Sequence, residues 1–574
     1  MKSPVIVVRA GIQYKSVIYY PKLDEETIRK DDGGSIVFSM YGAGWVDGVF
    51  VSKPSDLFGF FKNNNKSYLS KVFQSQRGSL TLYIKDGDKY FVVPDPLSGS
   101  MLFYYKENEN WFISSDLESL LLVLKESGIE PEKRFDYLTE LISTGNGGFV
   151  PSSYEGVCVL DPFEYILITR DSVEILLSPE HDKLLSPVSD IEKKNLFHTV
   201  REEFVNNVRS VSQSSIKNKV AHLTGGFDSR LVLAALLSSG IDHDLFNVMC
   251  SGNEETNDKV IAKKLASHYD LIFTNSDGRN SANAFEPGKA LFPSMGMVRA
   301  NIPSRFLEDY VVMSGGYGGL LRSVYGSRAS LSNNSIENVL TSLFGKRFSS
   351  NENSGIISKR FYDFYYAEFE RYINKIKACG LPVNSILDYI FATKRNRYYI
   401  GSISALYSKY SPRVDPLYSV NALRLSLSLT EQERKSNVLG LNLLRSFDET
   451  MISLPFDVSK IDDFYRKNYN KVYEKDFIKR DLRVRNVERE RDFSGVAPTK
   501  SQIELSKSMN SSLMQILYLD DVQYRARGIL KKNRDLIEKN LNWKVVNRFY
   551  RGELKNRIHI RTAFSIYDSL NWYS

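Results

Sequence analysis

The sequence predicts an α/β protein in which a strand-rich amino-terminal part precedes a parallel-sheet part and a helical carboxyl-terminal part. Three observations carry this prediction. A chain of 574 residues is too long for one core and divides into domains. Residues 1 to about 180 contain short alternating apolar segments separated by turns, which is typical of antiparallel strands. From residue 218 onward, short strands alternate with helical segments, which favours a parallel sheet.

The amino-terminal part contains two segments with the pattern of a β-hairpin. The segment GSLTLYIKDGDKYFVVPDP (78–96) alternates apolar residues around Asp86-Gly87-Asp88, and an Asp-Gly pair in that position indicates a tight reversal. The segment SMLFYYKENENWFISSD (100–116) repeats the design with a polar turn. LESLLLVLKESG then predicts a helix that ends at Gly128.

The domain boundary is expected near residue 185. The segment 178–200 begins polar and contains proline, then becomes helical, as a linker followed by a helix would. We therefore divide the chain into a domain of residues 1–185 and a domain of residues 186–574, with a helical carboxyl-terminal part from about 455.

The stretch HLTGGFDSRLVLAALLSSG (222–240) predicts a turn between a buried strand and a helix. KNKVAHLT is the strand, SRLVLAALLSSG is the helix, and Gly225 and Gly226 lie between them. Glycines in this turn let a ligand approach the backbone N–H groups, and the positive end of the helix dipole lies at the same place. Residues 224–229, which we call the glycine loop, are therefore suited to bind an anion. The spacing is neither that of a Walker A loop nor that of the dinucleotide fingerprint.

Two further strand–loop units extend the pattern. Residues 242–274 predict a strand, a loop containing Asp258 and a helix, and residues 310–326 (YVVMSGGYGGLLRSVYG) predict a strand followed by a glycine-rich loop. In a parallel sheet, ligands bind beyond the carboxyl ends of the strands. The three loops are therefore expected to lie together.

Composition excludes several classes of protein. The chain is 42% hydrophobic and 25% charged, its six histidines form no metal-binding pattern, and no apolar run is long enough to span a bilayer. Three separate cysteines, Cys158, Cys250 and Cys379, fit a reducing compartment. The start MKSPVIVVRAG has too short an apolar core for a signal peptide, so the cytoplasm is expected.

The net charge is +8, and much of the positive excess lies in the segment 465–493, where lysines, arginines and tyrosines are mixed. Six acidic residues interrupt this basic run: Glu474, Asp476, Asp481, Glu488, Glu490 and Asp492. The mixture favours a solvated, salt-bridged helix over a nucleic-acid interface.

The string T-G-G-F-D-S resembles the pyrophosphate loop, S-G-G-x-D-S, of the ATP-pyrophosphatases, with Thr224 in place of the first serine. The resemblance implies that ATP binds here and is split between its α and β phosphates, with Mg²⁺ held by Asp228. The residues it assigns to ATP and pyrophosphate are Leu223, Thr224, Gly225, Gly226, Phe227, Asp228, Ser229, Val248, Ser314 and Gly315. Backbone N–H groups and the Ser229 hydroxyl suit the charge of pyrophosphate, and a carboxylate suits Mg²⁺.

A second resemblance extends from about residue 78 to 447. PDPLSGSMLFYY…WFISSDLESLL and YLTELISTG…YEGVCVLDPFEYILI look like parts of the amino-terminal domain of asparagine synthetases. The resemblance implies the N-terminal-nucleophile αββα sandwich for residues 1–185 and an ATP-pyrophosphatase domain after it. In that family the sandwich releases ammonia from glutamine with an amino-terminal cysteine. This chain begins Met1-Lys2-Ser3 and its first cysteine is Cys158, so no glutaminase activity is expected.

The chain departs from the family at two chemically important places. The third element resembles S-G-D-G-A-D-E-L-F-G-G-Y, yet no carboxylate lies between Met313 and Arg322. The family's catalytic lysine falls at Leu441. The cations left to act on the phosphates are Arg322, Lys435 and Arg445, and we predict that Lys435 or Arg445 faces the glycine loop with Arg322 on the opposite wall.

The resemblance implies an AMP-forming carbon–nitrogen ligase with ATP and Mg²⁺ as cofactors. A substrate carboxylate becomes an acyl-adenylate, and an amine then forms the amide. Relatives without the glutaminase cysteine include β-lactam synthetases and lasso-peptide macrolactam cyclases, so an intramolecular cyclisation is favoured. A peptide is one candidate substrate, and a biosynthetic partner protein one candidate partner.

Two alternatives stay open. The first is a non-catalytic nucleotide-binding or scaffolding protein, which would explain why no carboxylate lies between Met313 and Arg322. A tRNA-modifying enzyme fits the basic charge, although about 220 residues precede the glycine loop, which such enzymes usually carry near the amino terminus. No membrane partner is expected.

Overall fold

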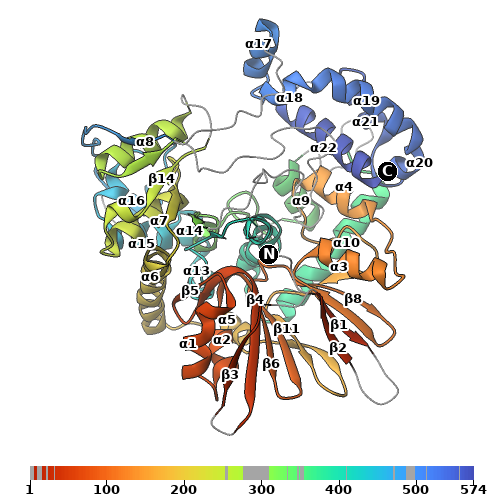
Figure 1. Ribbon diagram of the computed structural model, residues 1–574. Coiled ribbons are helices and arrows are strands. Elements are labelled where there is room, and N and C mark those ends of the chain that lie inside the picture. Colours follow the sequence, from red (N-terminus) through yellow and green to blue (C-terminus); the bar gives the residue numbers. More distant parts are fainter. Residues whose placement is uncertain are drawn as a thin grey trace.

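A computed structural model describes most of the chain (Figure 1). The described residues are 5–9, 16–20, 24–30, 33–251, 256–275, 309–332, 334–345, 348, 355–408, 410–469, 472–486, 498–511, 513–554 and 556–574.

Two antiparallel sheets form the amino-terminal part, in red and orange in Figure 1. One sheet has the order β10-β8-β9-β1-β2, and its strands are β1 (Val5–Arg9), β2 (Ser16–Tyr20), β8 (Phe103–Glu107), β9 (Asn110–Ser114) and β10 (Val157–Val159). The other has the order β12-β11-β7-β6-β4-β3, with β5 paired to β4, and its strands are β3 (Glu26–Arg29), β4 (Ser35–Val46), β5 (Val49–Val51), β6 (Arg77–Asp86), β7 (Lys89–Pro94), β11 (Glu164–Ile168) and β12 (Val173–Leu177).

These sheets pack face to face with helices outside both. Strand β1 shows why, because its side chains alternate: Ile6 and Val8 join a cluster between the sheets, whereas Val5 and Val7 pack toward the outer helices. Helices α1 (Phe58–Asn63) and α2 (Tyr68–Ser75) cover one sheet, and α3 (Leu117–Glu126) and α4 (Phe135–Thr144) cover the other. The result is a helix–sheet–sheet–helix arrangement.

The hairpins predicted for this part are confirmed. Strands β6 and β7 form a hairpin in which Asp86 pairs with Lys89, and the two-residue turn between them contains Gly87 at a φ of 62°. Strands β8 and β9 pair antiparallel, and α3 is followed by Gly128 at a φ of 79°.

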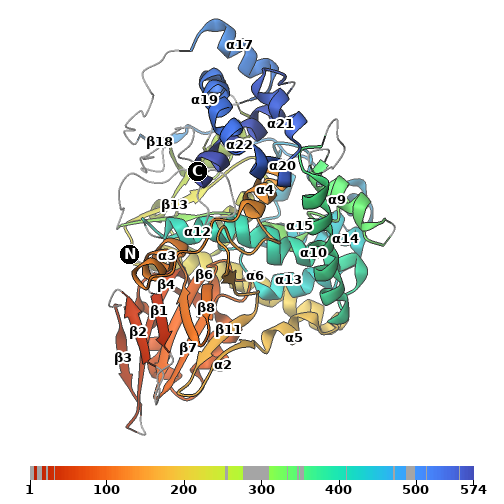
Figure 2. The ribbon, with the colours of Figure 1, turned by 90° about the vertical axis from the view of Figure 1, so that its right-hand side faces the viewer.

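The second part is built on a six-stranded sheet in which every pairing is parallel (Figure 2). Its order is β17-β16-β13-β14-β15-β18, and the strands are β13 (Asn218–His222), β14 (Asn247–Met249), β15 (Ile272–Thr274), β16 (Tyr310–Met313), β17 (Arg413–Val414) and β18 (Arg483–Arg485). The α/β prediction is confirmed at this level.

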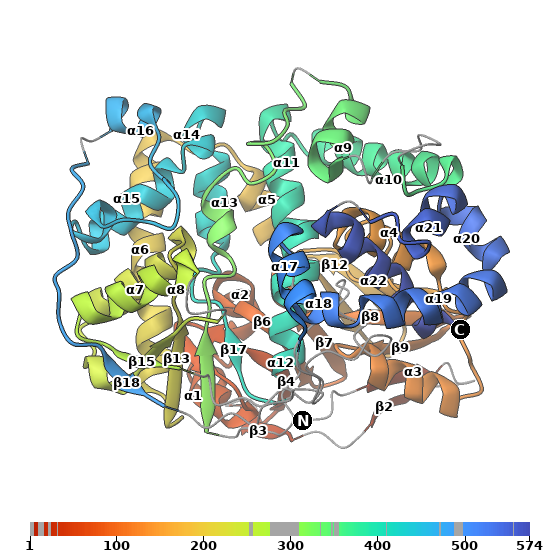
Figure 3. The same ribbon diagram turned by 90° about the horizontal axis from the view of Figure 1, so that it is seen from above.

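Helices connect and cover these strands (Figure 3). Between residue 180 and the last strand they are α5 (Glu180–Leu185), α6 (Asp190–Gln213), α7 (Phe227–Ser238), α8 (Asn257–His268), α9 (Ile336–Phe344), α10 (Lys359–Ala378), α11 (Ile386–Ile390), α12 (Ser402–Tyr407), α13 (Val420–Leu427), α14 (Glu431–Lys435), α15 (Val438–Phe447) and α16 (Asp463–Asn468). The carboxyl-terminal part, blue in Figure 1, consists of α17 (Lys500–Ser508), α18 (Leu513–Leu517), α19 (Leu519–Lys532), α20 (Arg534–Asn540), α21 (Trp543–Tyr550) and α22 (Arg557–Tyr573).

The prediction of a helix over residues 465–493 is wrong for most of the described residues in this range. Helix α16 ends at Asn468, residues 472–482 are not helical, and β18 joins the parallel sheet beside β15. The local charge pattern favoured a helix. At the edge of the sheet, however, β15 offers backbone hydrogen-bond partners, which favour a strand. Arg483 of β18 also forms an ion pair with Asp244 at 2.7 Å. Residues 487–493 lie outside the described part.

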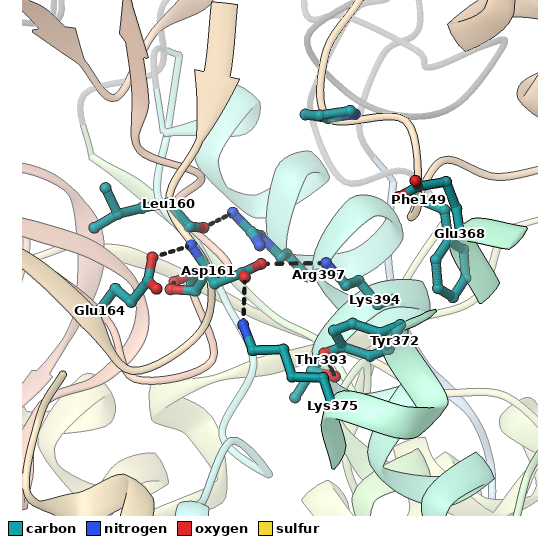
Figure 4. Close-up of polar contacts among 12 residues, drawn as sticks. Phe149, Leu160, Asp161, Glu164, Glu368, Tyr372, Lys375, Thr393, Lys394 and Arg397 are labelled. Carbon is teal, nitrogen blue, oxygen red and sulfur yellow. Dashed lines mark hydrogen bonds and ion pairs between the residues drawn. The ribbon is translucent and has the colours of Figure 1, made fainter. Parts of the chain in front are cut away.

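Polar contacts join the amino-terminal part to α10 and to the helical segment that follows α11 (Figure 4). Asp161 accepts from Lys394 at 3.2 Å and from Lys375 at 3.3 Å, while Arg397 donates to the Leu160 carbonyl. Burial raises and the neighbouring cations lower the pKa of Asp161, and the net direction is downward. Lys394 and Arg397 lie on two consecutive stretches of π-helix, Phe391–Arg395 and Arg397–Gly401, a geometry that is rare in proteins.

Candidate functional site

The glycine loop lies at the point in the parallel sheet where the strand order reverses. The chain runs from β13 to β14 and β15 on one side, then returns to β16 and β17 on the other side. The loop follows β13, and residues 314–319, which we call the second loop, follow the adjacent strand β16. Crevices for ligands form at such switch points, at the carboxyl ends of the strands.

The two loops touch through glycine. A Cβ atom on Gly315 would lie 2.7 Å from the backbone carbon of Asp228 and 2.8 Å from the backbone nitrogen of Ser229. Only glycine therefore allows the second loop to lie against the first turn of α7. This contact brings together the predicted residues of both loops.

Internal hydrogen bonds hold the glycine loop in shape. The Thr224 N–H donates to the Ser229 hydroxyl at 2.9 Å, and the Gly226 N–H donates to the Thr224 hydroxyl at 3.1 Å. Asp258, from the second strand–helix unit, accepts from the Gly225 N–H at 3.1 Å. Helix α7 has no side-chain cap at Gly226, so its first turn keeps N–H groups that can face an anion.

Asp228 and Arg322 form a two-pronged ion pair. Arg322 Nη2 donates to Asp228 Oδ2 at 2.8 Å, and Nη1 donates to Oδ1. The two side chains are 27% and 32% exposed for Arg322 and Asp228, so the pair is open to a ligand from solvent. Burial lowers and Asp228 raises the pKa of Arg322, with a net upward direction. The Arg322 guanidinium is therefore permanently charged, and it forms an ion pair with the Asp228 carboxylate.

The other predicted nucleotide-binding residues lie within the same strands and loops. Leu223 and Val248 are 1% and 0% exposed, so both residues are buried in the sheet. Ser314 is also buried, and its hydroxyl donates to Asp415 at 2.7 Å and accepts from Arg413 at 2.7 Å.

Lys435 and Arg445 are not brought to the glycine loop by any described contact. Lys435 pairs with Glu431 at 2.6 Å and Arg445 with Glu449 at 2.8 Å, each one turn away on the same helix or at its end. Helix α15 approaches the loop through Gly440, where a Cβ would lie 2.7 Å from the Phe227 ring. The apolar face of α15 is thus the one that packs on α7, which leaves Arg445 beside Glu449.

Lys460 is a cation that the sequence argument missed. Its Nζ lies 3.2 Å from Asp457 Oδ1, and the Asp457 N–H donates to the Gly225 carbonyl at 3.0 Å. A Cβ on Gly225 would lie 2.7 Å from the Asp457 Cβ, so the segment leans directly on the loop. The sequence shows only the short spacing D-V-S-K from Asp457 to Lys460, and this spacing points to the glycine loop only once the contact with Gly225 is known.

The amino-terminal part contacts the second loop through tyrosines. The Tyr317 and Tyr418 rings lie 4.6 Å apart, and the Tyr418 hydroxyl donates to buried Asp95 at 2.6 Å. Burial raises the pKa of Asp95, although donated hydrogen bonds from Tyr418 and two backbone N–H groups oppose the shift. Gly99 and Gly401 meet at the same junction, where a Cβ on Gly401 would lie 2.4 Å from the Gly99 Cα.

Comparisons with known proteins add little to this geometry. No protein-family model matches the chain, and no curated protein matches it. One similar solved structure is the glutamine phosphoribosylpyrophosphate amidotransferase from B. subtilis in complex with ADP and GMP; it is 10% identical, the match covers 57% of this chain and 71% of that one, and the TM-score is 0.17. Another is described as the allosteric regulatory enzyme of purine biosynthesis, with 11% identity, coverage of 55% and 69%, and a TM-score of 0.18. Such low scores carry no argument about this chain.

Two features are absent from the part of the chain that the structure describes. No group of three or more His, Cys, Asp or Glu side chains is placed there to hold a metal ion. Among the helices of the described part, none combines the length and apolarity needed to cross a membrane.

Proposed function

We propose that the protein is an ATP-dependent, AMP-forming carbon–nitrogen ligase that makes an amide bond through an acyl-adenylate. The single observation that carries the proposal is the T-G-G-F-D-S loop between β13 and α7, at the switch point of a parallel sheet. Arg322 and Lys460 beside this loop supply positive charge where nucleotide phosphates would lie.

The reaction has two steps. A carboxylate oxygen of the substrate attacks the α-phosphorus of ATP, the bond to the bridging oxygen breaks, and pyrophosphate leaves. An amine nitrogen then attacks the activated carbonyl, loses its proton and expels AMP. Pyrophosphate gains charge as the first bond breaks, and the uncapped first turn of α7 with Arg322 can offset that charge.

The amine is proposed to belong to the substrate. Residues 1–157 contain no cysteine, so this stretch holds no thiol that could release ammonia from glutamine. A tethered amine has a high effective concentration and needs no ammonia channel. An intramolecular cyclisation of a peptide or another carboxylate-bearing natural product is therefore the favoured version of the proposal.

The products of ATP turnover test the proposal. The purified protein would be incubated with radiolabelled ATP and small-molecule extract, and AMP would be separated from ADP. The expected result is AMP with equimolar pyrophosphate in the wild type and none above background for Asp228→Ala. ADP and phosphate as the sole products would refute the proposal.

A second candidate is a non-catalytic nucleotide-binding protein. The observation that favours it is the Asp228–Arg322 pair, in which both carboxylate oxygens are already engaged. ATP binding without AMP formation in any extract fraction would favour this candidate over the ligase.

A further inference from the structure

The resemblance implies Mg²⁺ at Asp228, and the donor set at this position does not fit it. Mg²⁺ takes six oxygen ligands at about 2.1 Å in near-octahedral geometry. Both oxygens of Asp228 accept from Arg322, and a dication at those oxygens would lie within a few ångströms of a permanent positive charge. Binding the metal would first require Arg322 to leave.

Arg322 is held in place from several sides. Its Nη1 also donates to the Gly318 carbonyl at 3.3 Å, and its guanidinium carbon lies 5.6 Å from the centre of the Phe227 ring. A Cβ on Gly318 would lie 2.4 Å from Asp228 Oδ1, so the carboxylate packs closely against Gly318 on one side. The pair is therefore a built feature of both loops and not a chance surface contact.

Arg322 also has donors to spare. A guanidinium carries five N–H groups, and only some are used on Asp228 and Gly318. Arginine can bind phosphate through two donors at once, and its charge does not depend on pH in the ordinary range. Lys460 adds a second cation on the Gly225 side of the loop.

We propose that Arg322 takes the place of the divalent cation, so that the glycine loop binds pyrophosphate and the phosphates of ATP without a metal. This inference rests on the proposed function only in placing phosphates at this loop. Asp228 then orients the guanidinium, a positioning role, and the side chain of Arg322 contacts the anion.

Calorimetric titration with inorganic pyrophosphate tests the inference without any need for turnover. Each titration would be run once in EDTA and once in excess Mg²⁺. The wild type is expected to bind with the same affinity, within about threefold, in both buffers. Arg322→Ala is expected to lose at least tenfold in EDTA and to recover part of the loss in Mg²⁺, because Asp228 becomes free for the metal. Lys359→Ala, at an exposed cation paired with Asp363 on α10, is the matched control and should bind as the wild type does.

Wild-type binding that requires Mg²⁺, or Arg322→Ala binding that equals the wild type in EDTA, would overturn the inference, as would no binding in either buffer. Arg322→Lys keeps the positive charge but lacks the two-pronged guanidinium, so its affinity for pyrophosphate in EDTA should lie between those of the wild type and the alanine variant. Circular dichroism establishes that each variant is folded. Metal-independent pyrophosphate binding without AMP formation would support this inference and refute the ligase proposal, so the two outcomes are distinguishable.

Discussion

At the scale of single residues, Arg322 sets the charge of the glycine loop because it engages both oxygens of Asp228. The sequence could single out both residues, since Asp228 belongs to a motif and Arg322 follows a loop without acids. It could not pair them, because they are 94 positions apart and meet only when β13 and β16 become neighbours.

The two cations beside the loop, Arg322 and Lys460, should each contribute to turnover if the proposed ligase reaction takes place there. Replacing either by alanine removes positive charge near the loop, and each change should slow AMP formation on the order of a hundredfold, or about 3 kcal/mol. Lys359→Ala, at an exposed cation paired on its own helix, should leave the rate within about twofold. Single-turnover assays on the three variants measure this. A full rate for Lys460→Ala would remove that residue from the proposed site.

Buried Glu140 should make stability depend on pH. Its carboxylate accepts from the N–H groups of Phe149 and Val150 at 2.9 and 3.1 Å, and burial raises its pKa to about 7 despite these bonds. Because the folded pKa is above the unfolded one, its stabilising contribution is complete below about pH 4.3 and declines until about pH 7. The free energy of unfolding should fall by roughly 3 kcal/mol over this range.

Urea denaturation at pH 5 and pH 8 measures the effect, with Glu140→Gln as the comparison. The glutamine side chain does not titrate, so the variant should lose most of the difference between the two pH values. An equal difference in both proteins would assign the pH dependence to other groups.

At the scale of elements, short-range patterns predicted hairpins and strand–loop–helix units well. The turn at Gly87 and the helix that ends before Gly128 depend on local backbone preferences, which the sequence displays directly. The strand β18 and the approach of Asp457 to Gly225 depend on contacts between distant segments. The position of Arg445 also depends on such contacts, since the packing of α15 decides which of its faces meets the loop.

Close contact of the two loops gives an element-scale prediction. Gly315→Ala should push the second loop away from α7, destabilise the protein by about 2 kcal/mol and weaken pyrophosphate binding. Gly528→Ala is the matched control, because a Cβ there meets nothing within 4 Å and α19 should gain slightly in stability. Urea denaturation and calorimetry measure the two effects, and unchanged binding in Gly315→Ala would contradict the contact.

At the scale of the whole molecule, one hydrophobic cluster crosses the expected domain boundary. It includes Trp45 of the first part and Leu231 of the second, and the Trp45 Nε1–H donates to the Asn207 carbonyl at 3.1 Å. Arg77 and Glu203 add an ion pair at 2.6 Å across the same junction. The two parts therefore share one core, which gives support to both.

Loss of this support should destabilise both parts together. Trp45→Ala removes a fully buried side chain and its hydrogen bond, and should cost about 4 kcal/mol. Calorimetry should show one transition at a lower temperature. Exposed Leu122 on α3 provides the control, and Leu122→Ala should leave the transition within about a degree. Two separate transitions, with only one shifted, would show that the parts unfold independently.

The central claim is that the glycine loop is where ATP binds, and hydrogen–deuterium exchange measures this most directly. Exchange would be followed by peptide mass spectrometry with and without saturating ATP, in the wild type and in Arg322→Ala. The account predicts slower exchange in peptides that cover 224–231 and 314–322, with the protection lost in Arg322→Ala. ATP binding that protects other segments and leaves these peptides unchanged would contradict it.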